Sequence, residues 1–133
     1  MDSPTPARTV VLLVDDAPDN RAMYTEYLTF KGYAVVTANG GDDAIAQAHA
    51  CRPDVIVLDV RMPDMTGAQA LRLLRSEVTF VNVPVAALTA YAFESERAKA
   101  LADGFDAFLP KPCLPDDLVV AIEGLLRGRR APQ

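Results

Sequence analysis

Five short apolar runs recur along the chain, and each is followed by a segment whose apolar residues have helical spacing. The runs lie at residues 9–14, 33–38, 54–59, 83–89 and 105–109. Strands that are apolar on both faces are typical of parallel sheets covered by helices. The pattern therefore predicts an α/β fold in which five parallel strands alternate with five helices that cover both faces of the sheet.

Local signals place the helices between these strands. Prolines suit the first turn of a helix, and glycines commonly end one. Thr66, followed by Gln69 three residues later, predicts a capping box, with Arg75 of that helix facing outward. The helices are expected from Pro18 to before Gly32, over residues 42–50, after Thr66, over about residues 93–102, and from near Pro115 to Gly128.

The length, hydrophobic content and net charge of the chain limit the number of domains and the classes of partner that it can have. The 133 residues are 50% hydrophobic and carry a net charge of −5. They predict one domain over residues 9–128, between a flexible leader at residues 1–8 and a tail or linker stump at residues 129–133. The negative charge, with no long basic stripe, argues against direct nucleic-acid binding.

The same sequence predicts a soluble, cytoplasmic protein. Cys51 and Cys113 are too few and too isolated to form a disulfide framework, so they indicate a reducing compartment. No apolar run is long enough for a signal peptide or for membrane insertion.

Polar residues follow four of the apolar runs. Asp15 and Asp16 end the first run, Asp59 the third and Thr89 the fourth, and Lys111 follows the fifth. Because ligands bind at the carboxyl ends of strands in open α/β sheets, we expect these side chains to share one site. Three neighbouring carboxylates repel one another, and an oxygen-only ligand set suits Mg²⁺, which also accepts phosphate oxygens.

A lysine, a hydroxyl and a carboxylate beside Mg²⁺ can hold a phosphoryl group in transit. The carboxylate can itself accept that group as an acyl phosphate, and Asp59 is the first candidate.

In this order, the motifs resemble those of a response-regulator receiver domain of two-component signalling. The resemblance extends over about residues 8–128. It implies a flavodoxin-like, doubly wound sheet with the strand order 2-1-3-4-5. The motifs are Asp15-Asp16, the segment Asp59-Val60-Arg61-Met62-Pro63-Asp64-Met65-Thr66-Gly67, Leu88-Thr89-Ala90, and Lys111-Pro112.

The resemblance also implies a role for each site residue. Asp59 would be phosphorylated, and Lys111, which a cis peptide would join to Pro112, would contact the phosphoryl group. Mg²⁺ would be held by Asp15, Asp16, Asp59 and the backbone carbonyl of Arg61.

Other positions would transmit and time the signal. Thr89 would move to hydrogen-bond the phosphoryl group, and Phe108, often Tyr in the family, would then turn inward. Arg61 and Tyr91 would shield the acyl phosphate from water and so prolong its lifetime.

The implied phosphoryl donor is a histidine kinase or a histidine phosphotransfer protein. His49, the only histidine, is expected to be a surface residue rather than that donor. The output would reach a downstream effector protein or domain through the fourth helix, fifth strand and fifth helix. The chain would be a stand-alone regulator or the receiver of a hybrid kinase or longer regulator. The face residues are Tyr91, Glu94, Glu96, Lys99 and Asp106.

Two other functions share part of this residue pattern. A Mg²⁺-dependent phosphatase or phosphotransferase would use the same nucleophile, but it would need a general acid where Arg61 stands. A flavin-binding domain would need a phosphate-binding loop rich in Ser, Thr and Gly, whereas Asp15 and Asp16 occupy that loop. Taken singly, the acidic pair could be a helix N-terminal charge pair, and Phe108 a core aromatic.

Overall fold

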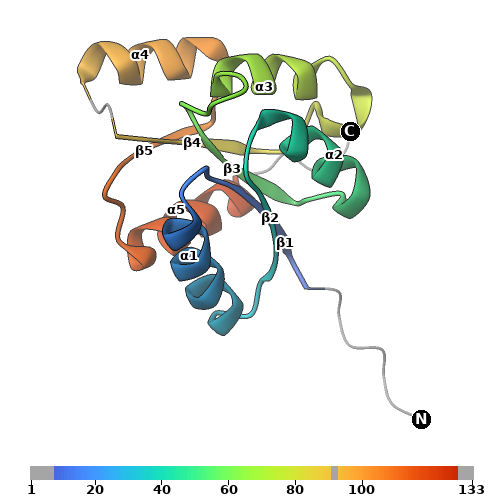
Figure 1. Cartoon of the computed structure of the whole chain (residues 1–133), viewed down its shortest axis with the longest axis vertical. Coiled ribbons are helices and arrows are strands. Elements are labelled where there is room, and N and C mark those ends of the chain that lie inside the picture. Colours follow the sequence, from blue (N-terminus) through green and yellow to red (C-terminus); the bar gives the residue numbers. More distant parts are fainter. Residues whose placement is uncertain (1–7, 91–92, 129–133) are drawn as a thin grey trace.

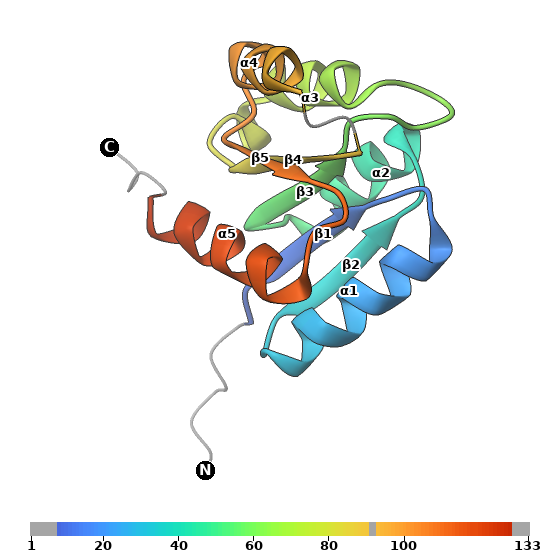
Figure 2. The same cartoon turned by 90° about the vertical axis from the view of Figure 1, so that its left-hand side faces the viewer.

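A five-stranded parallel sheet forms the centre of the protein (Figures 1 and 2). The computed structural model describes residues 8–90 and 93–128. The strand order is β2-β1-β3-β4-β5, which confirms the expected doubly wound topology. The strands are β1 (Val10–Val14), β2 (Ala34–Ala38), β3 (Val55–Asp59), β4 (Val85–Thr89) and β5 (Ala107–Pro110).

Helices cover both faces of this sheet. In Figures 1 and 2, α1 and α5 lie on one face, and α2, α3 and α4 lie on the other. None of the helices in the described ranges is both long enough and apolar enough to cross a membrane. The helices are α1 (Pro18–Phe30), α2 (Gly41–Cys51), α3 (Gly67–Arg75), α4 (Glu94–Asp103) and α5 (Pro115–Arg127).

The start of α3 confirms the predicted capping box. The Thr66 hydroxyl accepts a hydrogen bond from the Gln69 backbone N–H at 3.1 Å. The Gln69 side chain accepts one from the Thr66 N–H at 2.9 Å. This reciprocal pair fixes where the chain turns from the loop after β3 into the helix.

Alternating strand side chains fill two separate cores. Leu12 and Ile56 pack toward α2, α3 and α4, whereas Leu13 and Val57 pack toward α1 and α5. All five residues of β3 are buried, as its uninterrupted apolar pattern predicts. The parallel register then brings the carboxyl ends of the strands to one edge, with Asp59 of β3 beside Leu88 of β4.

The expectation that Arg75 of α3 faces outward is wrong. A short 3-10 helix at Val78–Phe80, which the sequence did not predict, follows α3. The Arg75 guanidinium is half-buried and donates to the carbonyls of Phe80 and Val83 at 2.8 and 2.6 Å. It also pairs with Asp106 at 3.0 Å. The arginine therefore holds the chain between α3 and β4 instead of facing solvent.

The start of α3 depends on a close backbone approach at Gly67. A methyl group on Gly67 would lie 2.8 Å from the Asp59 carbonyl oxygen and 2.9 Å from the Val60 Cα. We expect Gly67→Ala to lower the free energy of unfolding by about 1–3 kcal/mol, because backbone atoms cannot move aside easily. Chemical denaturation measures this change.

Gly124→Ala is the matched control. Gly124 lies in α5, where an added methyl group would lie 4.0 Å from the Arg127 guanidinium, at ordinary van der Waals distance. Its replacement should raise the free energy of unfolding by about 0.5–1 kcal/mol, because alanine loses less backbone entropy in a helix. Equal effects of the two substitutions would contradict the steric argument.

Candidate phosphoryl-acceptor site

Three buried polar side chains meet at the carboxyl edge of the sheet. The exposed fractions of Asp15, Asp59 and Thr89 are 0%, 4% and 2%. Asp16, next to Asp15, is exposed, and Lys111 is half-buried. The expected site residues thus come together from the ends of β1, β3, β4 and β5, although they are far apart in sequence.

Each carboxylate oxygen of Asp59 accepts a hydrogen bond. The Lys111 Nζ donates to Asp59 Oδ2 at 3.0 Å. The backbone N–H of Arg61 donates to Oδ1 at 3.2 Å. These two donors fix the orientation of the carboxyl group.

The two carboxylate oxygens of Asp15 have different partners. Its Oδ1 accepts a hydrogen bond from the Ala17 N–H at 2.9 Å. Its Oδ2 is buried and forms an ion pair with Lys111 Nζ, 3.3 Å away. The Arg21 guanidinium donates to the Asp15 backbone carbonyl at 2.6 Å and so supports this turn.

The backbone around Lys111 is anchored from two sides. The Lys111 N–H donates to the Thr89 carbonyl at 2.6 Å, and the peptide bond between Lys111 and Pro112 is cis, the geometry that the resemblance implied. The Tyr24 hydroxyl donates to the Cys113 carbonyl at 2.7 Å. No local signal in the sequence marks this contact between residues 89 positions apart.

Burial dominates the electrostatics of Asp59. Desolvation raises the pKa of its carboxyl from 3.8 to about 6, although the hydrogen bond from Lys111 acts in the opposite direction. For Lys111, burial lowers the pKa, but the hydrogen bond and charge of Asp59 and the charge of Asp15 outweigh it and raise the pKa overall. The metal-free site therefore holds excess negative charge at neutral pH.

These residues fit a divalent cation. Carboxylate oxygens of Asp15, Asp16 and Asp59 all lie within 4.8 Å of one another. The donor set is oxygen only, and the buried Asp15 Oδ2 faces the Lys111 ammonium at 3.3 Å, so this oxygen already lies in a position that favours a cationic partner. Hard oxygen ligands of this kind suit Mg²⁺, which also offsets the repulsion among the carboxylates.

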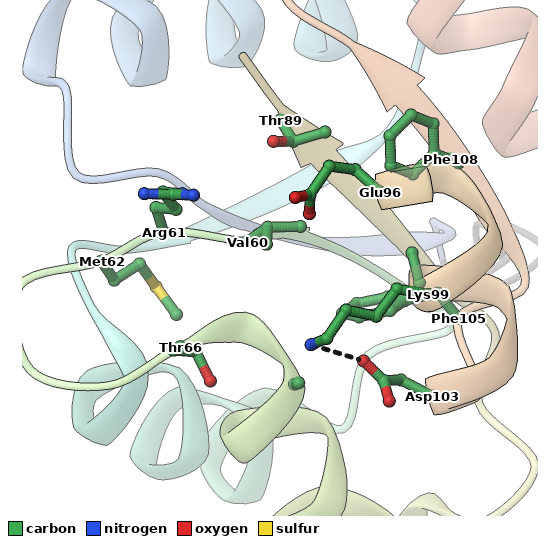
Figure 3. Close-up of a pocket in the computed structure, with 12 residues that line it drawn as sticks. Val60, Arg61, Met62, Thr66, Thr89, Glu96, Lys99, Asp103, Phe105 and Phe108 are labelled. Atoms are coloured by element: carbon green, nitrogen blue, oxygen red, sulfur yellow. Dashed lines mark ion pairs between the residues drawn. The ribbon is translucent and has the colours of Figure 1, made fainter. Parts of the chain in front are cut away.

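Val60 and Arg61, the two residues that follow Asp59, line a pocket of about 340 Å³ (Figure 3). Arg61 and Met62 lie on one side of it, and Lys99 and Phe105 on the other. The half-buried Phe108 lines this pocket together with Thr89. The pocket thus connects the end of β4 with α4 and β5. Tyr91, the second expected shielding residue, lies outside the described residues.

Comparison with known proteins agrees with this arrangement. A family model for the response regulator receiver domain matches residues 11–123. The chain belongs to this receiver-domain family. The response regulator MprA of Mycobacterium leprae is 41% identical to this receiver over 117 residues, which are 88% of this chain and 50% of MprA.

Relatives of this receiver include a kinase. The hybrid signal transduction histidine kinase D of Dictyostelium discoideum is 37% identical over 126 residues, 95% of this chain and 8% of the kinase. The chain spans half or less of the length of MprA and of this kinase. The solved structure of the chemotaxis response regulator CheY4 of Vibrio cholerae matches with a TM-score of 0.85 and 33% identity, covering 90% of this chain and 100% of CheY4.

The raised pKa of Asp59 predicts a stabilising substitution. Without divalent metal at pH 7.5, we expect Asp59→Asn to raise the free energy of unfolding by up to about 3 kcal/mol. The pKa of Asp59 is about two units higher in the folded protein than its ordinary value, and each unit destabilises the folded protein with an ionised Asp59 by ~1.4 kcal/mol. Asparagine carries no charge and avoids this cost.

The effect has a defined pH window. Above pH 6 the folded protein carries a disfavoured carboxylate at Asp59; below pH 6 the folded state takes up a proton there before the unfolded state does. The advantage of Asp59→Asn should therefore shrink as the pH falls through 6 and vanish below about 4. Denaturation of both proteins in EDTA across this range is the measurement, and a pH-independent difference would contradict the assignment.

Proposed function

We propose that Asp59 accepts a phosphoryl group from a histidine kinase or histidine phosphotransfer protein in a Mg²⁺-dependent reaction. The observation that carries this proposal is the pairing of Asp59 with Lys111, 3.0 Å apart, beside the buried Asp15. A carboxylate oxygen of Asp59 would attack the phosphorus of the donor phosphohistidine. The P–N bond would break, and its electron pair would leave with the imidazole.

The other site residues would prepare this step. Asp15, Asp16, Asp59 and the Arg61 carbonyl would hold Mg²⁺, which when bound supplies positive charge to the phosphoryl oxygens. Lys111 already contacts the acceptor carboxylate, so its ammonium group can stabilise the oxygens of the incoming phosphoryl group.

The pocket supports a route for the output. In our proposal, the Thr89 hydroxyl binds the phosphoryl group, and Phe108 moves deeper into the pocket that both residues line. Because phenylalanine lacks a hydroxyl, this movement would change partner affinity by packing, through the face of α4, β5 and α5. Glu94 and Lys99 on α4 are exposed and available to a partner.

The setting that we propose is a cytoplasmic signalling pathway. The effector would be a protein or a linked domain, without direct nucleic-acid contact or membrane insertion by this receiver. Cys51 and Cys113 are free thiols, which fits a reducing compartment. The receiver would act alone or within a hybrid kinase or a longer regulator.

Intact mass after incubation with Mg²⁺ and a small-molecule phosphodonor tests the acceptor. We expect one phosphoryl group on the wild-type chain and none on Asp59→Asn, because only the carboxylate can form the acyl phosphate. Chelation of Mg²⁺ beforehand should abolish the adduct.

Asp54→Asn is the control for the loss of one carboxyl group. Asp54 lies before β3, and its carboxylate accepts the Val10 N–H at 2.8 Å, away from the acidic cluster. This variant should be phosphorylated like the wild type. An adduct on Asp59→Asn, or a wild-type protein that neither forms an adduct nor binds a beryllofluoride phosphoryl mimic, would refute the proposal.

The lifetime of the acyl phosphate tests the shielding role of Arg61. Arg61 is exposed and lines the mouth of the pocket. We expect Arg61→Ala to speed dephosphorylation by a factor of about 3–10, which corresponds to ~1 kcal/mol of barrier, because water gains access to the phosphoryl group. Lys99→Ala, which removes a cation from the other side of the pocket, should leave the rate unchanged; an unchanged rate in Arg61→Ala would disprove shielding.

A further inference from the structure

The start of α2 receives its cap from a distant segment. The N-cap residue is Gly40, which has no side chain to satisfy the first backbone N–H groups of the helix. The Asp64 carboxylate takes this role from the loop after β3. Its Oδ1 accepts the Gly41 N–H at 3.0 Å, and its Oδ2 accepts the Asp42 N–H at 2.9 Å.

Two consecutive glycines make room for this contact. A methyl group on Gly40 would lie 2.9 Å from Asp64 Oδ1, and one on Gly41 would lie 2.2 Å from Met65 Cγ. Gly40 has an extended backbone, with φ at −176°, which any residue can adopt. The glycines are therefore required for the close approach of the loop and not for a special backbone conformation.

Asp64 ties down the tip of a loop whose two ends are already joined. The Gly67 N–H donates to the Val60 carbonyl at 2.7 Å, and an antiparallel bridge pairs Arg61 with Thr66. These contacts hold the ends of the loop to each other, whereas Asp64 is attached to a different element, α2. The Val60 N–H also donates to the Leu88 carbonyl of β4 at 3.1 Å, and the Arg61 N–H donates to Asp59 Oδ1, so the Arg61 backbone is anchored on the strand side. The link from Asp64 to α2 adds an attachment on the side of the loop tip.

The segment that leads from β2 into α2 also contacts the backbone of Asp15. The Asp15 N–H donates to the carbonyl of Ala38, the last residue of β2, at 3.2 Å. Residues 38–42 therefore contact both the loop that carries Asp15 and the loop that carries Arg61. The hydrogen bonds from Asp42 and then Gly41 also lower the pKa of Asp64, so its carboxylate stays charged at the positive end of the α2 dipole.

We propose that Asp64 is a positioning residue that, by capping α2, fixes the backbone carbonyl of Arg61 as a ligand for Mg²⁺. The inference rests on the proposed Mg²⁺-dependent function of Asp59. A carbonyl oxygen is uncharged and draws the cation less strongly than a carboxylate does, so its contribution depends on its placement. Mg²⁺ demands near-octahedral geometry, which makes a displaced ligand costly.

Removal of the cap should weaken the metal site more than it weakens the fold. We expect Asp64→Ala to reduce Mg²⁺ affinity about tenfold, a loss typical of residues that orient metal ligands. Asp64→Asn should give an intermediate loss, because the two N–H groups bind different carboxylate oxygens and the NH₂ group that replaces one of them cannot accept a hydrogen bond. Mg²⁺ titration followed by ¹H–¹⁵N chemical shifts gives the affinity of each variant.

Asp43→Ala is the matched control. Asp43 lies in the same first turn of α2, and its carboxylate accepts the Asn39 N–H at 3.1 Å. This substitution removes one charge and one capping hydrogen bond from the same helix end but leaves Asp64 in place. It should keep wild-type Mg²⁺ affinity. Wild-type affinity in Asp64→Ala, or an equal loss in both variants, would overturn the positioning role.

Hydrogen exchange in metal-free protein separates this inference from the proposed function. The Arg61 N–H, which donates to Asp59, should exchange faster in Asp64→Ala than in Asp43→Ala, because the loop has lost its hydrogen bonds to α2. If the wild-type protein binds no Mg²⁺, the proposed function fails, and this exchange rate alone decides whether Asp64 positions Arg61. Equal exchange rates in the two variants would then overturn it.

Discussion

The cost of burying a carboxylate at the end of an apolar strand governs this receiver. Asp59 follows four buried residues of β3 and is itself almost fully buried, so its charged form is disfavoured. Lys111 offsets part of this cost, and Asp15 adds to it. A site that is short of positive charge without metal is suited to binding a cation and then a phosphoryl group.

The parallel sheet makes this concentration of charge possible. Its register brings four strand ends to one edge, and the two apolar cores beneath them hold the strands in place. The stability of the cores can thus offset a site that is electrostatically unfavourable when empty of metal. Thr89 and Phe108 extend from this edge to the pocket under α4, which links the proposed chemistry to a surface that a partner can reach.

Hydrogen bonds between distant segments keep the loops of the site in position. Asp64 joins the loop after β3 to α2, and Tyr24 joins α1 to the backbone beyond Lys111. At the opposite end of the strands, Arg75 holds the connection between α3 and β4. Each of these side chains hydrogen-bonds to backbone groups of another segment, so these contacts specify the positions of the connecting loops.

The sequence alone determined the sheet, its helices and the meeting of Asp15, Asp59, Thr89 and Lys111 at one edge. These features follow from local periodicity and from the rule that parallel strands point the same way. Only the tertiary structure decided the protonation behaviour of Asp59, the inward role of Arg75 and the capping of α2 by Asp64. Burial depth and contacts between separate segments of the chain create these properties, and the periodicity within one element does not encode them.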